Sequence, residues 1–195
     1  MDRLEKQLQF IVEIDKLKSV YRRTYLIDGE RRENSAEHSW HLGMLAMVLA
    51  EYANEPVNVA RVMKMVLVHD IVEVDAGDTY IYDTQGAMDK AEREQAAAER
   101  IFGLLPADQR DEFRGLWEEF ESCATPDARF AATLDRFIPQ LHNFHTRGRS
   151  WQEHGITADR VLARNITISD GSLQLWEWTQ ALIARAVAEG FLDES

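Results

Sequence analysis

The strongest indication of the fold comes from the stretch Leu67-Val68-His69-Asp70-Ile71-Val72-Glu73. In this stretch an imidazole and a carboxylate lie next to each other within an otherwise aliphatic run. The apolar residues from Val59 to Ile71 recur at helical spacing and cover nearly the whole circumference. This pattern predicts a helix that is buried in the middle of the molecule and ends at the Ala76-Gly77 break. Because burying His69 and Asp70 without partners would be costly, compensating groups must reach them from elsewhere.

Helical periodicity extends to both sides of this segment. It predicts further helices over residues 4–20, 35–54, 88–105, 108–121, 128–145 and 173–188. Ser35 is the expected N-cap of the 35–54 helix, and Pro139 should cause a kink or break in the 128–145 helix. Residues 21–34, with the turn signal Asp28-Gly29, and residues 78–87 are predicted loops, because no stretch shows convincing strand alternation. The sequence therefore predicts an all-α fold, a helical bundle.

Length and composition favour a single domain over residues 1–195, since 45% hydrophobic residues suffice for a continuous core. The formal net charge of -12 argues against a nucleic acid partner, because phosphate contacts need Lys and Arg gathered on one face.

Cys123 is the only cysteine, which excludes an intrachain disulfide and suits a reducing compartment. Because the sequence shows neither a signal peptide nor an apolar run that could span a bilayer, we expect a cytoplasmic protein without membrane contact.

Two further segments supply the compensating groups. His38 follows Glu37 in the 35–54 helix, and Asp135 lies in the 128–145 helix, each with apolar residues nearby. We predict that His38, His69, Asp70 and Asp135 bind one divalent cation. Imidazole and carboxylate ligands suit Co, Mn, Fe, Zn or Mg, and four protein ligands around an octahedral ion leave room for water and a substrate oxygen. For an isolated His-Asp pair, a buried hydrogen bond is the competing explanation.

Two more carboxylates are candidates for acid–base chemistry. Glu73 lies four residues after His69, so helical geometry places it near the same face, one turn along. It is predicted to activate or orient a water, and Asp78 to protonate the leaving oxygen. The alternative interpretation of Glu73 is a charge on the helix surface.

Other histidines and the tryptophans have simpler interpretations. His41 is expected to be a packed, hydrogen-bonded histidine rather than a ligand. For His142 and His145, a surface loop or an interface is favoured over a second metal site. Trp151, Trp176 and Trp178 are predicted to pack in the core or between subunits rather than to stack on a base.

Four pieces of this sequence together resemble the HD-domain phosphohydrolases, within the branch that includes the bacterial 5′-deoxynucleotidases. The pieces are Glu33-Asn34-Ser35-Ala36-Glu37-His38-Ser39, His69-Asp70-Ile71-Val72-Glu73, Gly77-Asp78-Thr79 and Leu134-Asp135. The resemblance implies the HD-domain helical bundle and a homodimer. It also implies that His38, His69, Asp70 and Asp135 bind the metal, that Glu73 is catalytic and that Asp78 lies beside the reacting phosphate.

The resemblance also implies a phosphate-binding arginine between the first helix and His38. Arg22 is the better match and Arg23 the rival. Members of this branch place an aromatic residue after that arginine, whereas this sequence has Arg23, which bears on sugar discrimination. Residues 90–94 resemble the family too, although their charges would equally suit a solvated helical face.

The predicted function is metal-dependent hydrolysis of a small phosphorylated substrate, most of all a (deoxy)nucleoside 5′-monophosphate, by attack of a metal-activated water. One alternative is hydrolysis of another phosphorylated metabolite or of a pyrophosphate-bearing nucleotide. The other is a non-catalytic metal- or nucleotide-binding module, which the presence of both Glu73 and Asp78 disfavours.

Overall fold

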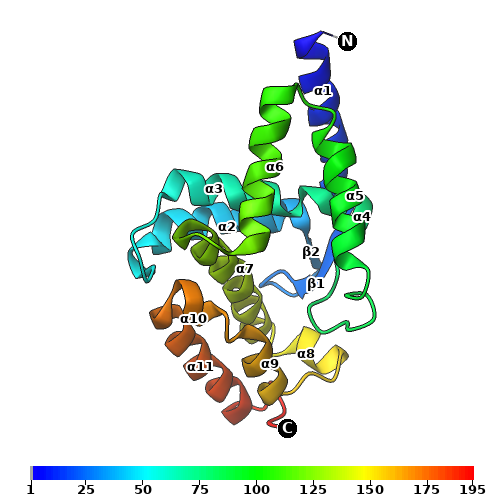
Figure 1. Ribbon diagram of the computed structural model, residues 1–195. Coiled ribbons are helices and arrows are strands. Elements are labelled where there is room, and N and C mark those ends of the chain that lie inside the picture. Colours follow the sequence, from blue (N-terminus) through cyan, green and yellow to red (C-terminus); the bar gives the residue numbers. More distant parts are fainter. Residues whose placement is uncertain (1) are drawn as a thin grey trace.

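The computed structural model describes residues 2–195, and helices dominate it (Figure 1). The elements in chain order are α1 (Arg3–Ile14), η1 (Asp15–Ser19, a 3-10 helix), β1 (Tyr21–Tyr25), β2 (Arg32–Asn34), α2 (Ser35–Leu49), η2 (Ala50–Tyr52), α3 (Val59–Val68), η3 (His69–Val72), α4 (Glu73–Ala76), α5 (Lys90–Phe102), α6 (Ala107–Ser122), α7 (Pro126–His145), α8 (Arg149–Glu153), α9 (Ala158–Asn165), α10 (Ile168–Gly171) and α11 (Leu173–Ala188).

Helices α2, α3 and α7 pack against one another and form the centre of the main hydrophobic core. Leu42, Val66 and Leu134, one from each helix, are completely buried. Helix α7 runs without a break through Pro139, so the predicted break does not occur there. The central position of these three helices matters for function, because each continues into, or carries, residues of the site described below.

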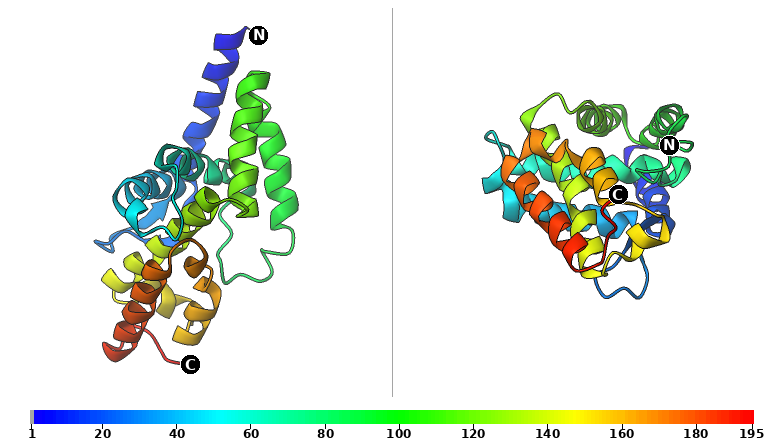
Figure 2. Two further views of the ribbon diagram at one scale, coloured as in Figure 1. Left: turned by 60° about the vertical axis from the view of Figure 1, so that its left-hand side comes forward. Right: turned by 90° about the horizontal axis from the view of Figure 1, so that it is seen from below.

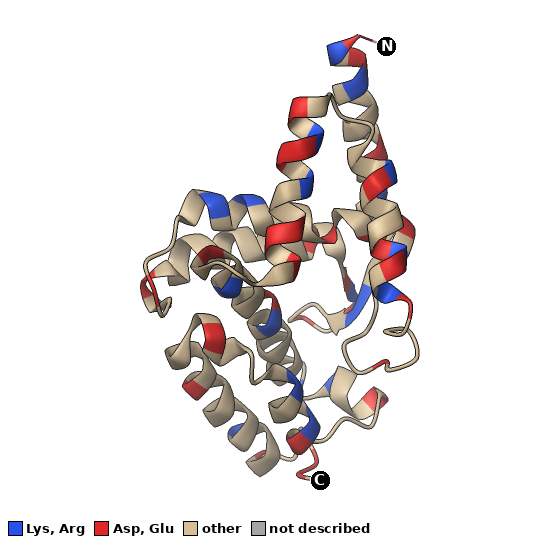
Figure 3. Ribbon diagram, in the orientation of Figure 1, with Lys and Arg blue, Asp and Glu red and all other residues tan. Residues whose placement is uncertain are grey.

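Helices α1, α5 and α6 lie side by side at the N-terminal end of the molecule, and the C-terminal helices lie at the opposite end (Figures 1 and 2). Phe10 and Phe113 join α1 to α6 through an edge-to-face contact with ring centroids 5.5 Å apart. Both basic and acidic positions are distributed along the ribbons of these helices in Figure 3. Within residues 2–195, each helix is too short or too polar to cross a lipid bilayer.

Residues 21–34 form an antiparallel β-hairpin, so the prediction of a loop is wrong. Strand β1 pairs with β2, with Tyr21 opposite Asn34. The turn between the strands contains Gly29, whose φ of 73° lies in the left-handed region that favours glycine. Strand alternation was not recognisable because the hairpin buries polar side chains, Thr24 and Glu33 among them.

The ends of α2 and α3 also differ from the prediction. Asn34 rather than Ser35 caps α2: its side chain accepts a hydrogen bond from the Glu37 backbone N–H (2.9 Å), and Glu37 accepts one from the Asn34 backbone N–H (3.2 Å). Helix α3 ends at Val68, and the His-Asp pair lies in the 3-10 turn η3 instead of mid-helix. This tighter turn leads directly into α4, which Gly77 ends with a φ of 73°.

Three short helices, α8 to α10, were not predicted, whereas α11 has the predicted bounds. A smaller apolar cluster joins this C-terminal part, with Trp151, Val161 and Ile183 buried in it. The prediction that Trp151 packs in a core is confirmed. Trp176 packs against the main core, and Trp178 is half exposed beside Phe137.

Candidate metal centre

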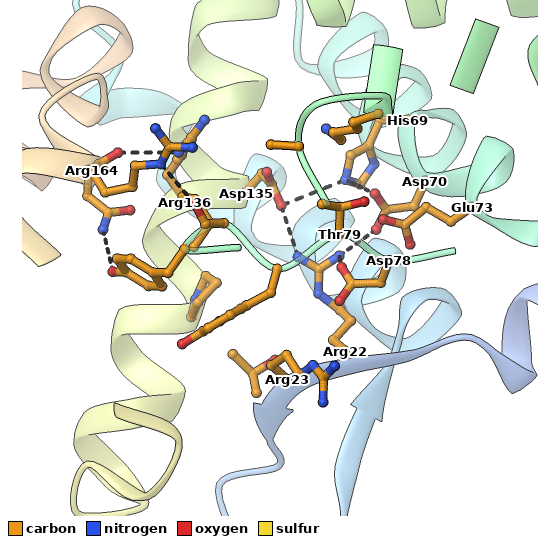
Figure 4. A pocket seen from close by; sticks show the side chains of 18 of the residues that line it. Arg22, Arg23, His69, Asp70, Glu73, Asp78, Thr79, Asp135, Arg136 and Arg164 are labelled. Atoms are coloured by element: carbon orange, nitrogen blue, oxygen red, sulfur yellow. Dashed lines mark hydrogen bonds and ion pairs between the residues drawn. The ribbon is translucent and has the colours of Figure 1, made fainter. Parts of the chain in front are cut away.

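Three segments that are far apart in the sequence bring the predicted metal ligands together. His38 lies in α2 and Asp135 in α7, and His38 Nε2 is 2.8 Å from Asp135 Oδ1. His69 and Asp70 lie in η3. His69 Nε2 is 3.0 Å from Asp70 Oδ1 and 3.8 Å from Asp135 Oδ1. The structure therefore gathers all four predicted ligands in one place. Figure 4 shows three of them, His69, Asp70 and Asp135.

The chemistry of this donor set fits a divalent cation. The ligand atoms of His38, His69 and Asp135 lie within 4.8 Å of one another. His69 Nε2 is buried without a hydrogen-bond partner, while His69 Nδ1 donates to the Val66 carbonyl at 2.9 Å. Because a carbonyl can only accept, Nδ1 carries a proton, and Nε2, which faces Asp70 and Asp135, is the nitrogen left to bind a cation.

The charged groups in this cluster shift one another's pKa values. Burial by itself would lower the pKa of His69, but the carboxylates of Asp70 and Asp135 outweigh burial and raise that pKa to about 9. The pKa of His38 is also raised against the effect of burial, mainly by its hydrogen bond to Asp135. Burial would raise the pKa of Asp135, yet the two histidines hold it well below its usual range. A cation bound here would thus replace protons on the histidines.

Strand β1 places the two candidate arginines differently. Arg22 points toward the cluster, with Nη1 2.8 Å from Asp70 Oδ2 and Nη2 3.6 Å from Asp135 Oδ1. Arg23, the next residue on the strand, is exposed and lies at the rim of the pocket (Figure 4). Successive side chains on a strand point to opposite faces, so only one of the two can face the carboxylates.

Glu73 and Asp78 both lie beside the cluster. Glu73 is buried and accepts a hydrogen bond of 2.7 Å from Ser35 Oγ, so the interpretation as a surface charge is wrong. Asp78 Oδ1 is 3.8 Å from Arg22 Nη1. Burial and the nearby Asp70 raise the pKa of both carboxyls, that of Glu73 well above its usual range. Two carboxyls with raised pKa values are suited to accepting and donating protons near neutral pH.

These residues form one end of a pocket of about 210 Å³. The remaining walls come from the 78–87 segment, α5, α7 and α9. They include Tyr80, Tyr82, Lys90, Glu94, Arg136, Gln140, Arg164 and Asn165. Glu94 is buried and lies 3.4 Å from Lys90, so residues 90–94 are not simply a solvated helical face.

Sequence reasoning missed the tyrosines, Arg136, Arg164 and Asn165, because no residue spacing connects α9 with the 78–87 segment. Their proximity depends on tertiary contacts such as the 2.9 Å hydrogen bond from Arg164 Nε to the Ile81 carbonyl.

His142 is buried rather than placed on a surface loop or at an interface, so that interpretation is wrong for His142, whereas His145 is exposed. His142 Nδ1 lies 3.7 Å from Glu33 Oε2. His41 packs against Trp40 and His142, as expected for a packed histidine. Ligand atoms of Glu33, His41 and His142 lie within 4.8 Å of one another, which makes this trio a second possible cation-binding group.

Comparison with known proteins agrees with this geometry. The model of the HD domain family matches residues 14–176. This chain belongs to the HD domain family. In that family it is 32% identical over 144 residues to "5'-deoxynucleotidase HDDC2" of Danio rerio, which covers 72% of this chain and 70% of that protein. It is 33% identical over 130 residues to "5'-deoxynucleotidase HDDC2" of Homo sapiens, which covers 66% of this chain and 62% of that protein.

A solved HD domain structure extends the similarity over the whole fold. The crystal structure of a "Predicted metal-dependent phosphohydrolase" from Magnetospirillum magnetotacticum MS-1 has 52% sequence identity and a TM-score of 0.94. The alignment covers 98% of this chain and 96% of that one. The resemblance predicted from the motifs, the all-helical fold class and the function as a metal-dependent phosphohydrolase are confirmed.

Proposed function

We propose that this protein releases phosphate from (deoxy)nucleoside 5′-monophosphates, with one divalent cation held by His38, His69, Asp70 and Asp135. The observation that carries the proposal is that His69, Asp70 and Asp135 line one end of a pocket together with an arginine and two protonatable carboxyls, with His38 buried directly beside Asp135. The names of the similar deoxynucleotidases support the same substrate class.

The chain's own residues have distinct roles in this reaction. Bound at this site, a divalent cation would lower the pKa of a water and offset negative charge on the phosphate. Arg22 binds nonbridging phosphate oxygens. Glu73 accepts a proton from the attacking water as its oxygen bonds to phosphorus. Asp78 donates a proton to the 5′ oxygen as the ester P–O bond breaks. The raised pKa of Asp78 favours the protonated form that this step requires. Arg22 acts against the raised pKa of Glu73, and a bound cation would do the same, which favours the ionised form of Glu73 that accepts a proton.

The rest of the pocket suits a nucleoside. The rings of Tyr80 and Tyr82 lie 5.2 Å apart and offer aromatic surface near the carboxylates. Gln140 lines the pocket and its Oε1 has no hydrogen-bond partner, so this oxygen can accept a hydrogen bond from a sugar or base, whereas Asn165 is held by Gln140 and by the Val161 carbonyl. Because Arg23 stands where related deoxynucleotidases have an aromatic residue, we expect weak discrimination between deoxyribose and ribose.

The direct test is phosphate release from a panel of deoxyribo- and ribonucleoside 5′-monophosphates, each with Co, Mn, Fe, Zn or Mg. We expect turnover that disappears together with bound metal in Asp70→Ala. Asp159→Asn, at an exposed position of α9, is the matched control and should keep both. Normal turnover by Asp70→Ala would contradict the proposal.

A second candidate is a substrate with an additional anionic group, such as a pyrophosphate-bearing nucleotide or another phosphorylated metabolite. Arg136 and Arg164 favour it, because they place positive charge in the pocket away from the metal ligands (Figure 4). Including such phosphates in the panel separates the two candidates. Absence of hydrolysis with every metal and phosphate would instead support a non-catalytic binding module.

The subunit number, the cellular location and the metal content stay predictions. We expect a cytoplasmic homodimer with one divalent metal ion, whose identity is open. Light scattering of the purified protein and its elemental analysis measure the subunit number and the metal.

A further inference from the structure

A buried carboxylate outside the proposed ligand set lies directly behind the metal centre. Glu33 on β2 is only 1% exposed. An isolated carboxylate in such a place would be strongly destabilising, so its neighbours must stabilise it. Thr24 Oγ1 donates a hydrogen bond to Glu33 Oε2 at 3.3 Å, which is too little to compensate a full charge. The other groups facing Glu33 all belong to, or pack against, the site.

The most informative of these neighbours is His38. Its Nε2 faces Asp135 in the cluster. Its Nδ1, on the opposite side of the ring, is buried without a hydrogen-bond partner and lies 3.4 Å from Glu33 Oε2. His69 also has Nε2 toward the cluster, but its Nδ1 hydrogen-bonds the Val66 carbonyl at 2.9 Å. Each histidine thus has an acceptor behind it, but only His38 has a charged one.

We propose that Glu33 is a positioning residue that accepts the Nδ1–H of His38 and so holds the Nε2 lone pair toward the cation. The inference rests on the proposed metal site. A carboxylate behind a ligating histidine fixes the tautomer and ring orientation and makes the ligand nitrogen more basic. In this protein the effect acts on His38 alone, because His69 has a neutral carbonyl in the corresponding place.

Glu33 also contacts the phosphate-binding arginine from behind. Arg22 Nε is 3.9 Å from Glu33 Oε2, whereas the Nη atoms face Asp70 and Asp135. One carboxylate therefore orients both a metal ligand and the group proposed to hold phosphate. The adjacent strands of the hairpin, which carry Arg22 and Glu33, set the relative positions of the two side chains.

The test compares Glu33→Gln and Glu33→Ala with the wild-type protein and with Glu30→Gln, an exposed control on the same hairpin. Calorimetric titration with Co²⁺ measures affinity and stoichiometry independently of catalysis. We expect Glu33→Gln to weaken Co²⁺ binding by about 10-fold and Glu33→Ala by about 100-fold. Glutamine keeps an acceptor oxygen without the charge, so it should be the milder change. Glu30→Gln should leave the affinity unchanged.

Histidine ¹⁵N and ring N–H signals of the Zn²⁺-loaded protein provide a readout that a merely structural role would not move. We expect the Nδ1–H of His38 to exchange slowly with water in the wild type and faster in Glu33→Ala, and a cooperative thermal transition to show that the variant is folded. Unchanged Co²⁺ affinity in both folded Glu33 variants, together with an unchanged Nδ1–H signal in Glu33→Ala, would overturn the proposal.

Stoichiometry separates the remaining interpretation. The wild type could bind two Co²⁺ ions, with Glu33→Gln and His142→Ala each losing one ion while the remaining site keeps its affinity. That result would make Glu33 a ligand of a second ion together with His41 and His142, and the positioning role would be wrong. The proposed function is tested by a different measurement. If the protein binds Co²⁺ but hydrolyses no nucleotide, the proposed function fails, while the effect of Glu33 on Co²⁺ affinity can still be measured.

Discussion

The histidines of the metal centre hold protons that a cation must displace. Because the pKa of His69 is raised to about 9 from its ordinary value of 6.5, His69 is protonated in the metal-free protein over most of the range between these values. We expect metal affinity to rise by about tenfold per pH unit between pH 6.5 and 9 for each proton displaced. Calorimetric titrations at several pH values measure this, with the exposed His145→Asn as control. A pH-independent affinity would show that His69 is not a ligand.

The raised pKa of His69 also makes stability depend on pH. Metal affinity rises with pH, whereas the stability of the metal-free protein falls. A raised folded-state pKa adds to the free energy of unfolding below pH 6.5, and this contribution is lost as the pH rises through 9. We therefore expect the metal-free protein to be less stable at pH 9 than at pH 6.5 in urea unfolding. The difference should be smaller in His69→Asn, and the raised pKa of His38 accounts for part of what remains.

Arg22 and Arg23 are neighbours with different expected effects. Replacing Arg22 with Lys removes the two-nitrogen contact with the site, and kcat should fall by about 10²–10³-fold. Arg23→Lys is the matched control and should change kcat little, because Arg23 lies at the rim. Steady-state kinetics on a nucleoside 5′-monophosphate measures both. Equal losses in the two variants would contradict the assignment of phosphate binding to Arg22.

At the scale of elements, the first turn of α2 connects stability with function. Asn34 caps this helix, and His38 lies one turn further along. We expect Asn34→Ala to lower the free energy of unfolding by about 1 kcal/mol and also to weaken metal binding. Asn58→Ala, which removes the cap of α3, should cost about the same stability without affecting the metal. Urea unfolding and metal titration of both variants test the difference, and unchanged metal affinity in Asn34→Ala would disprove the coupling.

The elements that could be predicted are those with apolar periodicity, such as α11, whose bounds match the expectation. The β-hairpin could not be recognised because its buried positions include Thr24 and Glu33, whose side chains are polar. The proximity of His38, His69, Asp70 and Asp135 could be predicted because an imidazole or a carboxylate within an apolar segment needs a partner. The sequence could not rank Arg22 above Arg23 by geometry. Their side chains point to opposite faces of strand β1, but this segment was expected to be a loop, for which no such alternation is predicted.

At the scale of the whole molecule, a cation would connect three segments from different parts of the chain, α2, η3 and α7. A ligand that binds only the folded state adds about 2.7 kcal/mol at 100 times its Kd, which corresponds to a rise in Tm of roughly 5–10 °C for a protein of this size. Differential scanning calorimetry with and without Co²⁺ measures the shift. Asp70→Ala should show no shift, and a shift equal to that of wild type would place the stabilising ion elsewhere.

Helix α7 carries a proline four residues after Asp135, on the wall of the pocket. Since proline has no N–H, the main-chain oxygen of Asp135 is not engaged by the usual helical donor. Asp135, proposed to bind the cation through its carboxylate, therefore keeps a main-chain oxygen that no helical N–H occupies. Replacing Pro139 with alanine would restore that helical hydrogen bond without altering any charge.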